Sequence, residues 1–169
     1  MQDLFHCFEN YPSLSSSIIQ EGSTSTFSEH YYPHVYKADC SFGSCNFVNL
    51  LKQNLGDVTA LWIQNPPNTL YDWHIDREIR QCSINFEIKE NHNAMALFRE
   101  PIGKGKDIIY YNIHKVKYAI GKPTVLNVKS PHCVINHSNE SRVILSLCVH
   151  KSSYKETVDY MKTLNISEY

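Results

Sequence analysis

Seven short segments between residues 60 and 149 have the hydrophobic pattern of β-strands. They are rich in β-branched and aromatic residues, and the stretches between them are rich in Asn, Gly, Pro and Ser. We therefore predict a mostly β protein, a double-stranded β-helix of the jelly-roll or cupin-like type with flanking helices. An immunoglobulin-like sandwich is the alternative, but its Cys–Trp–Cys arrangement is missing from the sequence. The predicted strands are residues 60–64, 82–88, 94–100, 107–113, 124–128, 132–136 and 142–149.

Helical periodicity occurs on both sides of these strands. Residues 44–55 place four large apolar side chains on one face, and Gly56 is suited to end a helix. Residues 153–164 begin with Ser153 and Glu156, which have the spacing of a capping box. We expect both segments to be helices that pack outside the sheets.

The 169 residues are enough for one domain with a single sizeable core. The Ser- and Thr-rich residues 13–28 predict a loop or a loosely packed lead-in, with a short strand near Ile18 and Ile19 as the alternative. We expect one domain over residues 1–169. Its expected parts are a lead-in with one helix in 1–59, a β-barrel core in 60–150 and a C-terminal helix in 151–169.

Composition and charge exclude several classes of protein. The formal net charge of −1 gives no general attraction to nucleic acid or anionic membranes. The sequence lacks an apolar run of membrane-spanning length, and its N-terminal residues do not resemble a secretory signal. Six cysteines occur without a C-x-x-C pair, which favours free thiols in a cytoplasmic protein over disulfides.

Metal-binding chemistry is suggested first by the segment YDWHID. His74 and Asp76 are two residues apart, so on a strand both side chains point to the same face and can chelate one ion. A second imidazole from a distant strand would complete two histidines and one carboxylate, the facial set of non-haem Fe(II) oxygenases. An H-x-D pair alone is a weak signal, because solvated polar residues often have this spacing.

The segment PHCVINHSNESRVILSL provides the partners. His132 precedes Arg142 by ten residues, with a polar turn between two apolar strands. If residues 137–141 form a hairpin loop, Asn136 pairs with Arg142 and His132 lies opposite Ser146. Such a hairpin would place His132 and Arg142 on one face, about 13 Å apart along the strands. Each residue alone is more often a structural histidine or a surface charge, but together with His74 and Asp76 they suggest a common site.

With these residues the sequence resembles the Fe(II)/2-oxoglutarate-dependent oxygenases over residues 61–149. HCVINHSNESRVIL is also similar to the aspartyl/asparaginyl β-hydroxylase-like branch and to small phage and bacterial relatives. The resemblance implies that His74, Asp76 and His132 bind Fe(II), that Arg142 binds the distal carboxylate of 2-oxoglutarate, and that O2 is used to hydroxylate a substrate. Aspartyl hydroxylases proper lack the carboxylate ligand, so their substrate is not carried over. Ile144 stands where many relatives have a Ser or Thr that assists the arginine.

Two further residues follow the H-x-D pair at positions where relatives often carry Arg and Asn. We therefore expect Arg80 and Asn85 to contact co-substrate or substrate, with surface or turn roles as the alternative. His137 is the rival third ligand, and its place in the polar turn predicts a solvated side chain instead. A small molecule or peptide is the expected substrate, and the oligomeric state is left open. The competing interpretation is a cupin-type metalloprotein that uses the same His/Asp/His site without 2-oxoglutarate.

Overall fold

The computed structural model of the protein describes residues 3–29, 35–76, 79–102 and 110–166. These residues form two antiparallel sheets. The large sheet has the order β1-β9-β6-β11-β4-β3-β2, and the small sheet has the order β5-β10-β7-β8. The strands of the large sheet are β1 (Phe5–Cys7), β2 (Ser28–Glu29), β3 (Tyr36–Asp39), β4 (Val58–Asn65), β6 (Cys82–Glu87), β9 (Pro123–Leu126) and β11 (Arg142–Val149). Those of the small sheet are β5 (Thr69–His74), β7 (Ala94–Ile102), β8 (Tyr110–Lys115) and β10 (His132–Asn136).

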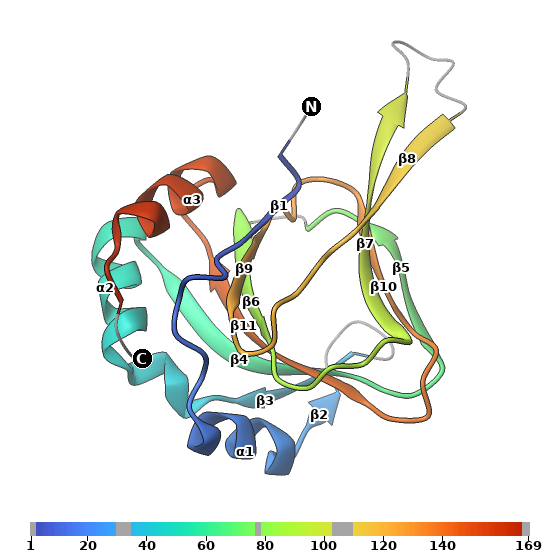
Figure 1. Cartoon of the computed structure of the whole chain (residues 1–169), viewed down its shortest axis with the longest axis horizontal. Coiled ribbons are helices and arrows are strands. Elements are labelled where there is room, and N and C mark those ends of the chain that lie inside the picture. The colour runs from blue at the N-terminus through green and yellow to red at the C-terminus, as the bar shows by residue number, and fades with distance from the viewer. Residues whose placement is uncertain (1–2, 30–34, 77–78, 103–109, 167–169) are drawn as a thin grey trace.

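The two sheets face each other, and the helices lie on the outer side of the large sheet (Figure 1). The predicted double-stranded β-helix with flanking helices is therefore confirmed. All seven predicted strands are present, although residues 107–109 of one prediction lie outside the described residues. The large sheet also takes in β1, β2 and β3, which come from the segment predicted to be a lead-in. The helical elements are α1 (Ser16–Thr24), the 3-10 helix η1 (Ser41–Ser44), α2 (Asn46–Leu55) and α3 (Tyr154–Thr163).

Local sequence explains where the two predicted helices begin and end. Cys45 caps the start of α2, one residue after the first residue of the predicted helix, because its side chain accepts from the backbone N–H of Val48. Gly56 ends the helix with a φ of 83°. Ser153 and Glu156 form the predicted capping box of α3. No described helix has the length and apolar character needed to cross a membrane.

Apolar residues fill two separate layers. The larger cluster lies between the large sheet and the helices, and it includes the fully buried Trp62, Phe47 and Phe86. The smaller cluster lies between the sheets and includes Phe98 and Leu126. Most of the buried apolar surface that stabilises the fold therefore lies between the large sheet and the helices. The space between the two sheets can then hold polar side chains.

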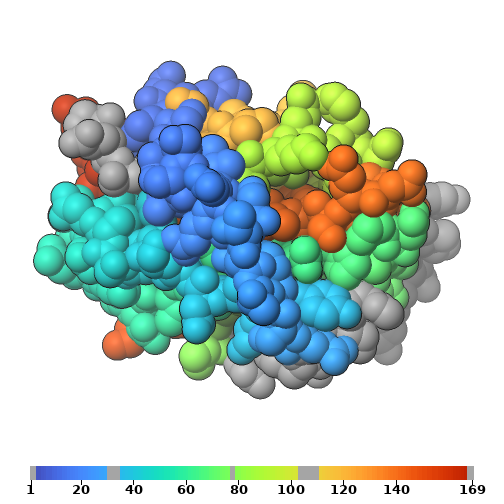
Figure 2. All heavy atoms as spheres, turned by 90° about the horizontal axis from the view of Figure 1, so that it is seen from below, coloured from blue at the N-terminus to red at the C-terminus, as the bar shows by residue number. Residues whose placement is uncertain are grey.

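The prediction of a loop or short strand in residues 13–28 is wrong, because α1 occupies this segment. Ile18 and Ile19 pack against the larger apolar cluster, and the Ser15 side chain caps the helix by accepting from the Ile18 backbone. Burial of these side chains outweighs the weak helix propensity of the Ser- and Thr-rich sequence. Figure 2 shows this segment in blue on one face of the molecule, with the light-blue residues of the β3 region beside it.

Gly22 allows α1 to approach the sheet. A Cβ atom at this position would lie 2.6 Å from a ring atom of Trp62, which is fully buried. Gly22→Ala is therefore expected to lower the free energy of unfolding by about 1–3 kcal/mol through overpacking. The higher helix propensity of alanine, about 1 kcal/mol, offsets part of this loss. Urea unfolding followed by circular dichroism would measure the change. Gln20→Ala, on the exposed side of the same helix, should leave the midpoint nearly unchanged or raise it.

The predicted hairpin of residues 132–136 with 142–149 is also wrong. β10 pairs with β5 and β7 in the small sheet, whereas β11 pairs with β4 and β6 in the large sheet. Asn136 therefore does not pair with Arg142, and His132 does not lie opposite Ser146. His132 instead pairs with His74 on β5.

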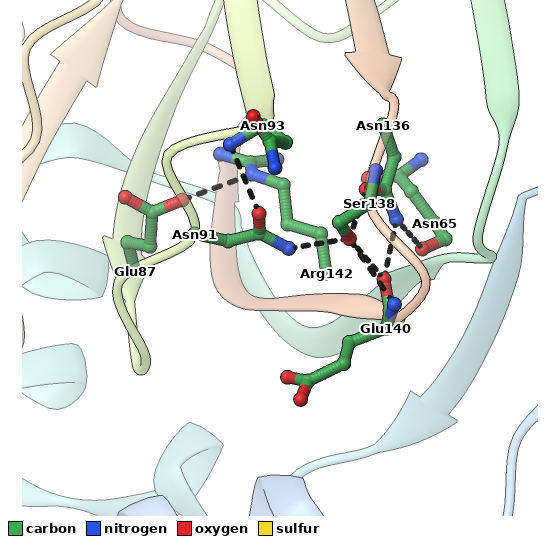
Figure 3. A network of polar contacts seen from close by, with 8 residues as sticks. All are labelled: Asn65, Glu87, Asn91, Asn93, Asn136, Ser138, Glu140 and Arg142. Atoms are coloured by element: carbon green, nitrogen blue, oxygen red, sulfur yellow. Dashed lines mark hydrogen bonds and ion pairs between the residues drawn. The ribbon is translucent and has the colours of Figure 1, made fainter.

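A polar network explains why residues 137–141 cross between sheets instead of closing a hairpin (Figure 3). The Nδ2 atom of buried Asn136 donates to the backbone oxygens of Asn65, Pro66 and Glu140, at 3.0, 2.9 and 2.8 Å. Its Oδ1 accepts from Ser138. One amide thus satisfies backbone groups of both the crossing segment and the end of β4, which fixes the arch.

Candidate metal centre

Three predicted ligand residues meet at one end of the space between the sheets. One side-chain atom from each of His74, Asp76 and His132 lies within 4.8 Å of the other two, and this is the only such group of His, Cys, Asp or Glu in the described part of the chain. The Nε2 atoms of His74 and His132 lie 3.7 and 3.8 Å from Asp76 Oδ1. His74 ends β5 and His132 begins β10, and their pairing in the ladder brings the two rings together.

The Nδ1 atoms of His74 and His132 fix the orientation of the two imidazole rings. His74 Nδ1 is 2.6 Å from the backbone oxygen of Asp72, and His132 Nδ1 is 2.9 Å from that of Ser130. A carbonyl only accepts, so each Nδ1 donates, and the nitrogen that a neutral ring would offer to a metal is Nε2, which lies toward Asp76. This is how metal-binding histidines are commonly oriented by backbone groups.

Asp76 lies just beyond β5, so the prediction that both H-x-D residues belong to a strand is correct only for His74. The Asp76 backbone N–H donates to Val128 O at 2.9 Å. This hydrogen bond positions Asp76 although the pairing of β5 has already ended at His74. Arg80 donates through Nη1 to Asp76 Oδ2 at 3.1 Å, which leaves Oδ1 turned toward the histidines. Arg80, expected at co-substrate or substrate, thus contacts a candidate ligand.

His132 is kept neutral by its surroundings. Burial, together with the nearby His74, lowers the pKa of His132 to about 4 and outweighs the opposite effect of Asp76. The ring also stacks on Phe98, with 5.4 Å between ring centroids. An unprotonated imidazole at neutral pH does not need to lose a proton before it can bind a metal ion.

A cavity of about 280 Å³ extends from these three residues between the sheets. Its lining includes Phe98, Leu126 and Val128 from the smaller apolar cluster. Arg142 also lines it, although it comes from the opposite sheet to His132. The prediction that the two residues share one face of a hairpin is therefore wrong, but both line the same cavity because the inner faces of the two sheets look toward each other.

Arg142 is nearly inaccessible to solvent and has an internal counter-ion. Its Nε donates to Glu87 Oε1 at 3.0 Å (Figure 3), and its guanidinium carbon lies 5.2 Å from the ring centroid of Tyr118. Burial by itself lowers the pKa of Arg142, but Tyr118 and Glu87 outweigh it, so the pKa is raised and the guanidinium stays charged. Burial raises the pKa of Tyr118, which therefore keeps its proton.

Several buried polar atoms around Arg142 lack a hydrogen-bond partner. They are Arg142 Nη2, Tyr118 Oη and Asn85 Oδ1, all from residues that line the cavity. A buried donor without a partner costs about 1–3 kcal/mol, so such groups mark a place where a ligand or water is expected. The predicted Asn85 thus lines the same cavity as Arg142.

Tyr118 and Glu87, which contact the guanidinium of Arg142, were not predicted from the sequence. The predicted difference between His137 and His132 agrees with the structure. His137 is exposed, and it is not part of the cluster of candidate ligands. The three clustered residues fit a divalent transition metal with two imidazole donors and one carboxylate, a set suited to Fe(II) with open coordination positions.

Comparison by sequence identifies no relatives. No protein-family model matches the chain, and no curated protein matches it.

Comparison by structure finds many matches. A prolyl-4-hydroxylase from Pseudomonas putida has 14% identity, a TM-score of 0.59 and coverage of 88% of this chain and 93% of that one. A prolyl hydroxylase from Trichoplax adhaerens, solved with a peptide of hypoxia inducible factor, has 14% identity, a TM-score of 0.60 and coverage of 91% and 86%. HygX from Streptomyces hygroscopicus, solved with nickel, 2-oxoglutarate and hygromycin B, has 7% identity, a TM-score of 0.56 and coverage of 85% and 81%. The chain therefore has the fold of these oxygenases.

Proposed function

We propose that the protein is an Fe(II)- and 2-oxoglutarate-dependent dioxygenase that hydroxylates a small molecule, an amino acid or a peptide. The main support is that the His74, Asp76 and His132 cluster shares one cavity with Arg142, whose charged guanidinium has an unpartnered nitrogen. Bound Fe(II) would couple the oxidation of 2-oxoglutarate to succinate and CO2 with the hydroxylation of a substrate by O2.

The ligand residues would hold the metal through groups that are already oriented. His74 and His132 offer Nε2 while their Nδ1 atoms stay bound to backbone oxygens. Arg80 engages one oxygen of Asp76 and so favours binding of the metal through the other oxygen. Partners of this kind typically contribute 10- to 100-fold, roughly, to metal affinity or activity.

The far part of the cavity suits a carboxylate. Arg142 and the protonated Tyr118 offer donors, and together they can bind the distal carboxylate of 2-oxoglutarate. Tyr118 would then fill the role that Ser or Thr has in many relatives, since Ile144 stands at that position here. Asn85 lines the same cavity and can donate to the ligand through its amide nitrogen.

The size of the cavity bears on the substrate. Its volume of about 280 Å³ is at the lower limit of ordinary ligand sites, which are roughly 300–1,000 Å³. 2-Oxoglutarate would take up much of it, so a substrate would present only one small group or side chain to the metal. The Trichoplax adhaerens protein was solved with a peptide and HygX with hygromycin B, so this fold accommodates both kinds of ligand. The six free cysteines support an intracellular location for this chemistry.

The second candidate function is that of a cupin-type metalloprotein without 2-oxoglutarate. It would use the same three ligands for Zn or Mn chemistry. Arg142 favours the oxygenase, because its Nη2 atom is buried without a partner in the cavity lining and can donate to the carboxylate of a ligand.

The first test is binding of metal and co-substrate in the absence of O2. We expect 2-oxoglutarate to bind only when Fe(II) is present, with a weak visible charge-transfer band, because the co-substrate would contact both the metal and Arg142. Anaerobic calorimetry and absorption spectroscopy would measure both. Equal binding of 2-oxoglutarate without metal, or no binding at all, would contradict the proposal. Succinate release with pools of amino acids, peptides and metabolites would then identify the substrate class.

A further inference from the structure

Glu87 lies behind the proposed carboxylate site. It ends β6, and its side chain is 10% exposed, while that of its partner Arg142 is 1% exposed. Arg142 lines the cavity, but Glu87 does not. The carboxylate accepts from Nε of Arg142 (Figure 3), and it does so from outside the residues that line the cavity.

The contact uses only one edge of the guanidinium. Glu87 Oε1 binds Nε, whereas Nη2 is buried without a partner. Arginine presents five N–H donors in a rigid plane, so a group that fixes Nε also fixes the directions of both terminal nitrogens. Glu87 thus leaves the Nη2 atom of Arg142 available to a second carboxylate.

Glu87 also changes the charge that a ligand meets. In the protein without ligand, a buried guanidinium needs a counter-charge, and Glu87 supplies it. When a dicarboxylate binds, Glu87 and the distal carboxylate are two negative charges around one guanidinium. The repulsion between them reduces the advantage that Arg142 gives to a charged distal group over a neutral one.

We propose that Glu87 is a positioning residue that orients Arg142 and, through its charge, sets both the affinity for the co-substrate and the selectivity for its distal carboxylate. This inference rests on the proposed function. Glu87 does not touch the co-substrate, and it acts only through Arg142.

The test compares E87Q with the unchanged protein, both loaded with Fe(II) under anaerobic conditions. The amide of E87Q can still accept from Arg142 Nε but carries no charge. We expect 2-oxoglutarate to bind roughly tenfold more tightly to E87Q, because one like charge close to its distal carboxylate is removed. The Fe(II) affinity should be unchanged, because Glu87 has no contact with the metal ligands.

Selectivity provides a measurement that a purely structural role would not change. 2-Oxopentanoate, in which a methyl group replaces the distal carboxylate, is the counterpart of 2-oxoglutarate without a distal charge. The ratio of the two affinities should increase in E87Q, because only the charged ligand gains. E140Q is the matched control, since Glu140 is 65% exposed and pairs with Lys89 at the surface. It should leave the ratio unchanged.

E87D separates positioning from charge, and it keeps the counter-ion of Arg142 if E87Q fails to fold. Its shorter side chain withdraws from Nε, so we expect severalfold weaker binding of 2-oxoglutarate. An unchanged ratio in E87Q, or binding by E87D equal to that of the unchanged protein, would overturn the role of Glu87. If the unchanged protein itself binds no 2-oxoglutarate with Fe(II), the proposed function fails instead, so the two failures are distinguishable.

Discussion

His132→Ala is expected to abolish Fe(II) binding and turnover, while His137→Ala leaves both nearly unchanged. His132 Nε2 faces Asp76 Oδ1 at 3.8 Å, and its Nδ1 is held by Ser130 O, so the ring is oriented for metal binding. His137 lies in the crossing segment with an exposed side chain. We expect the Fe(II) affinity of His132→Ala to fall by more than about 100-fold, beyond the usual effect of losing a residue that only supports a ligand. Anaerobic calorimetry and iron content after gel filtration would measure the loss.

Folding must be checked separately, because His132 is also a packing residue. Its ring stacks on Phe98, so its removal leaves a small cavity and lowers the free energy of unfolding as well. His132→Gln fills the space with a poor metal ligand and is the matched variant. Wild-type iron affinity in both His132 variants, or loss of activity in a folded His137→Ala, would show that the third ligand is not His132.

The sequence predicted the face of each site residue better than it predicted the pairing of strands. Period-two alternation placed His132 and Arg142 toward the core in either arrangement, because side-chain direction depends only on position within a strand. Pairing depends on what the chain does between strands. The amide of Asn136 binds three backbone oxygens and directs residues 137–141 into the other sheet. An Asn in a polar turn does not reveal such distant partners.

Glu87 and Asn85 had a signal in the sequence that was not used fully. Ser83, Asn85 and Glu87 alternate with apolar residues in β6, and every residue of this strand is buried. A polar face on a fully buried strand is unusual, since buried polar groups need partners. Such a pattern indicates an internal polar cavity. Tyr118 had no comparable signal, because it lies between β8 and β9, where neither helical nor strand periodicity applies.

The missed helix α1 illustrates a different limit. Its sequence has poor intrinsic helix propensity, and its stability comes from contacts with residues far along the chain. Glu21 accepts from Trp62 Nε1 at 3.1 Å and from Ser41 N at 2.8 Å, and Gly22 lies against the Trp62 ring. None of these partners is visible from local periodicity.

Arg142→Lys is expected to weaken 2-oxoglutarate binding by roughly 2–3 kcal/mol, the order of a lost charge-assisted pair of hydrogen bonds. This corresponds to about 30- to 150-fold in affinity. Lysine keeps the positive charge beside Glu87 but lacks the planar fork that can bind one carboxylate while another holds Nε. Fe(II) affinity should stay nearly constant, because Arg142 is not among the clustered ligand residues. Calorimetry with Fe(II) alone, and then with 2-oxoglutarate added, separates the two affinities.

A second variant, E87Q/R142M, tests whether an unpaired buried charge, and not the loss of the Arg142 contact, causes the weaker binding of 2-oxoglutarate. Removing Arg142 alone leaves Glu87 buried without its partner, which typically costs about 3–5 kcal/mol of stability. The double variant E87Q/R142M removes both charges, and replacement of a buried ion pair by uncharged groups of similar size is often tolerated. It should fold, bind Fe(II) and lose the preference for 2-oxoglutarate over 2-oxopentanoate. If Arg142→Lys and E87Q/R142M both lose Fe(II) affinity together with 2-oxoglutarate affinity, Arg142 supports the fold instead. If their 2-oxoglutarate affinity equals that of the unchanged protein, the distal carboxylate binds elsewhere in the cavity.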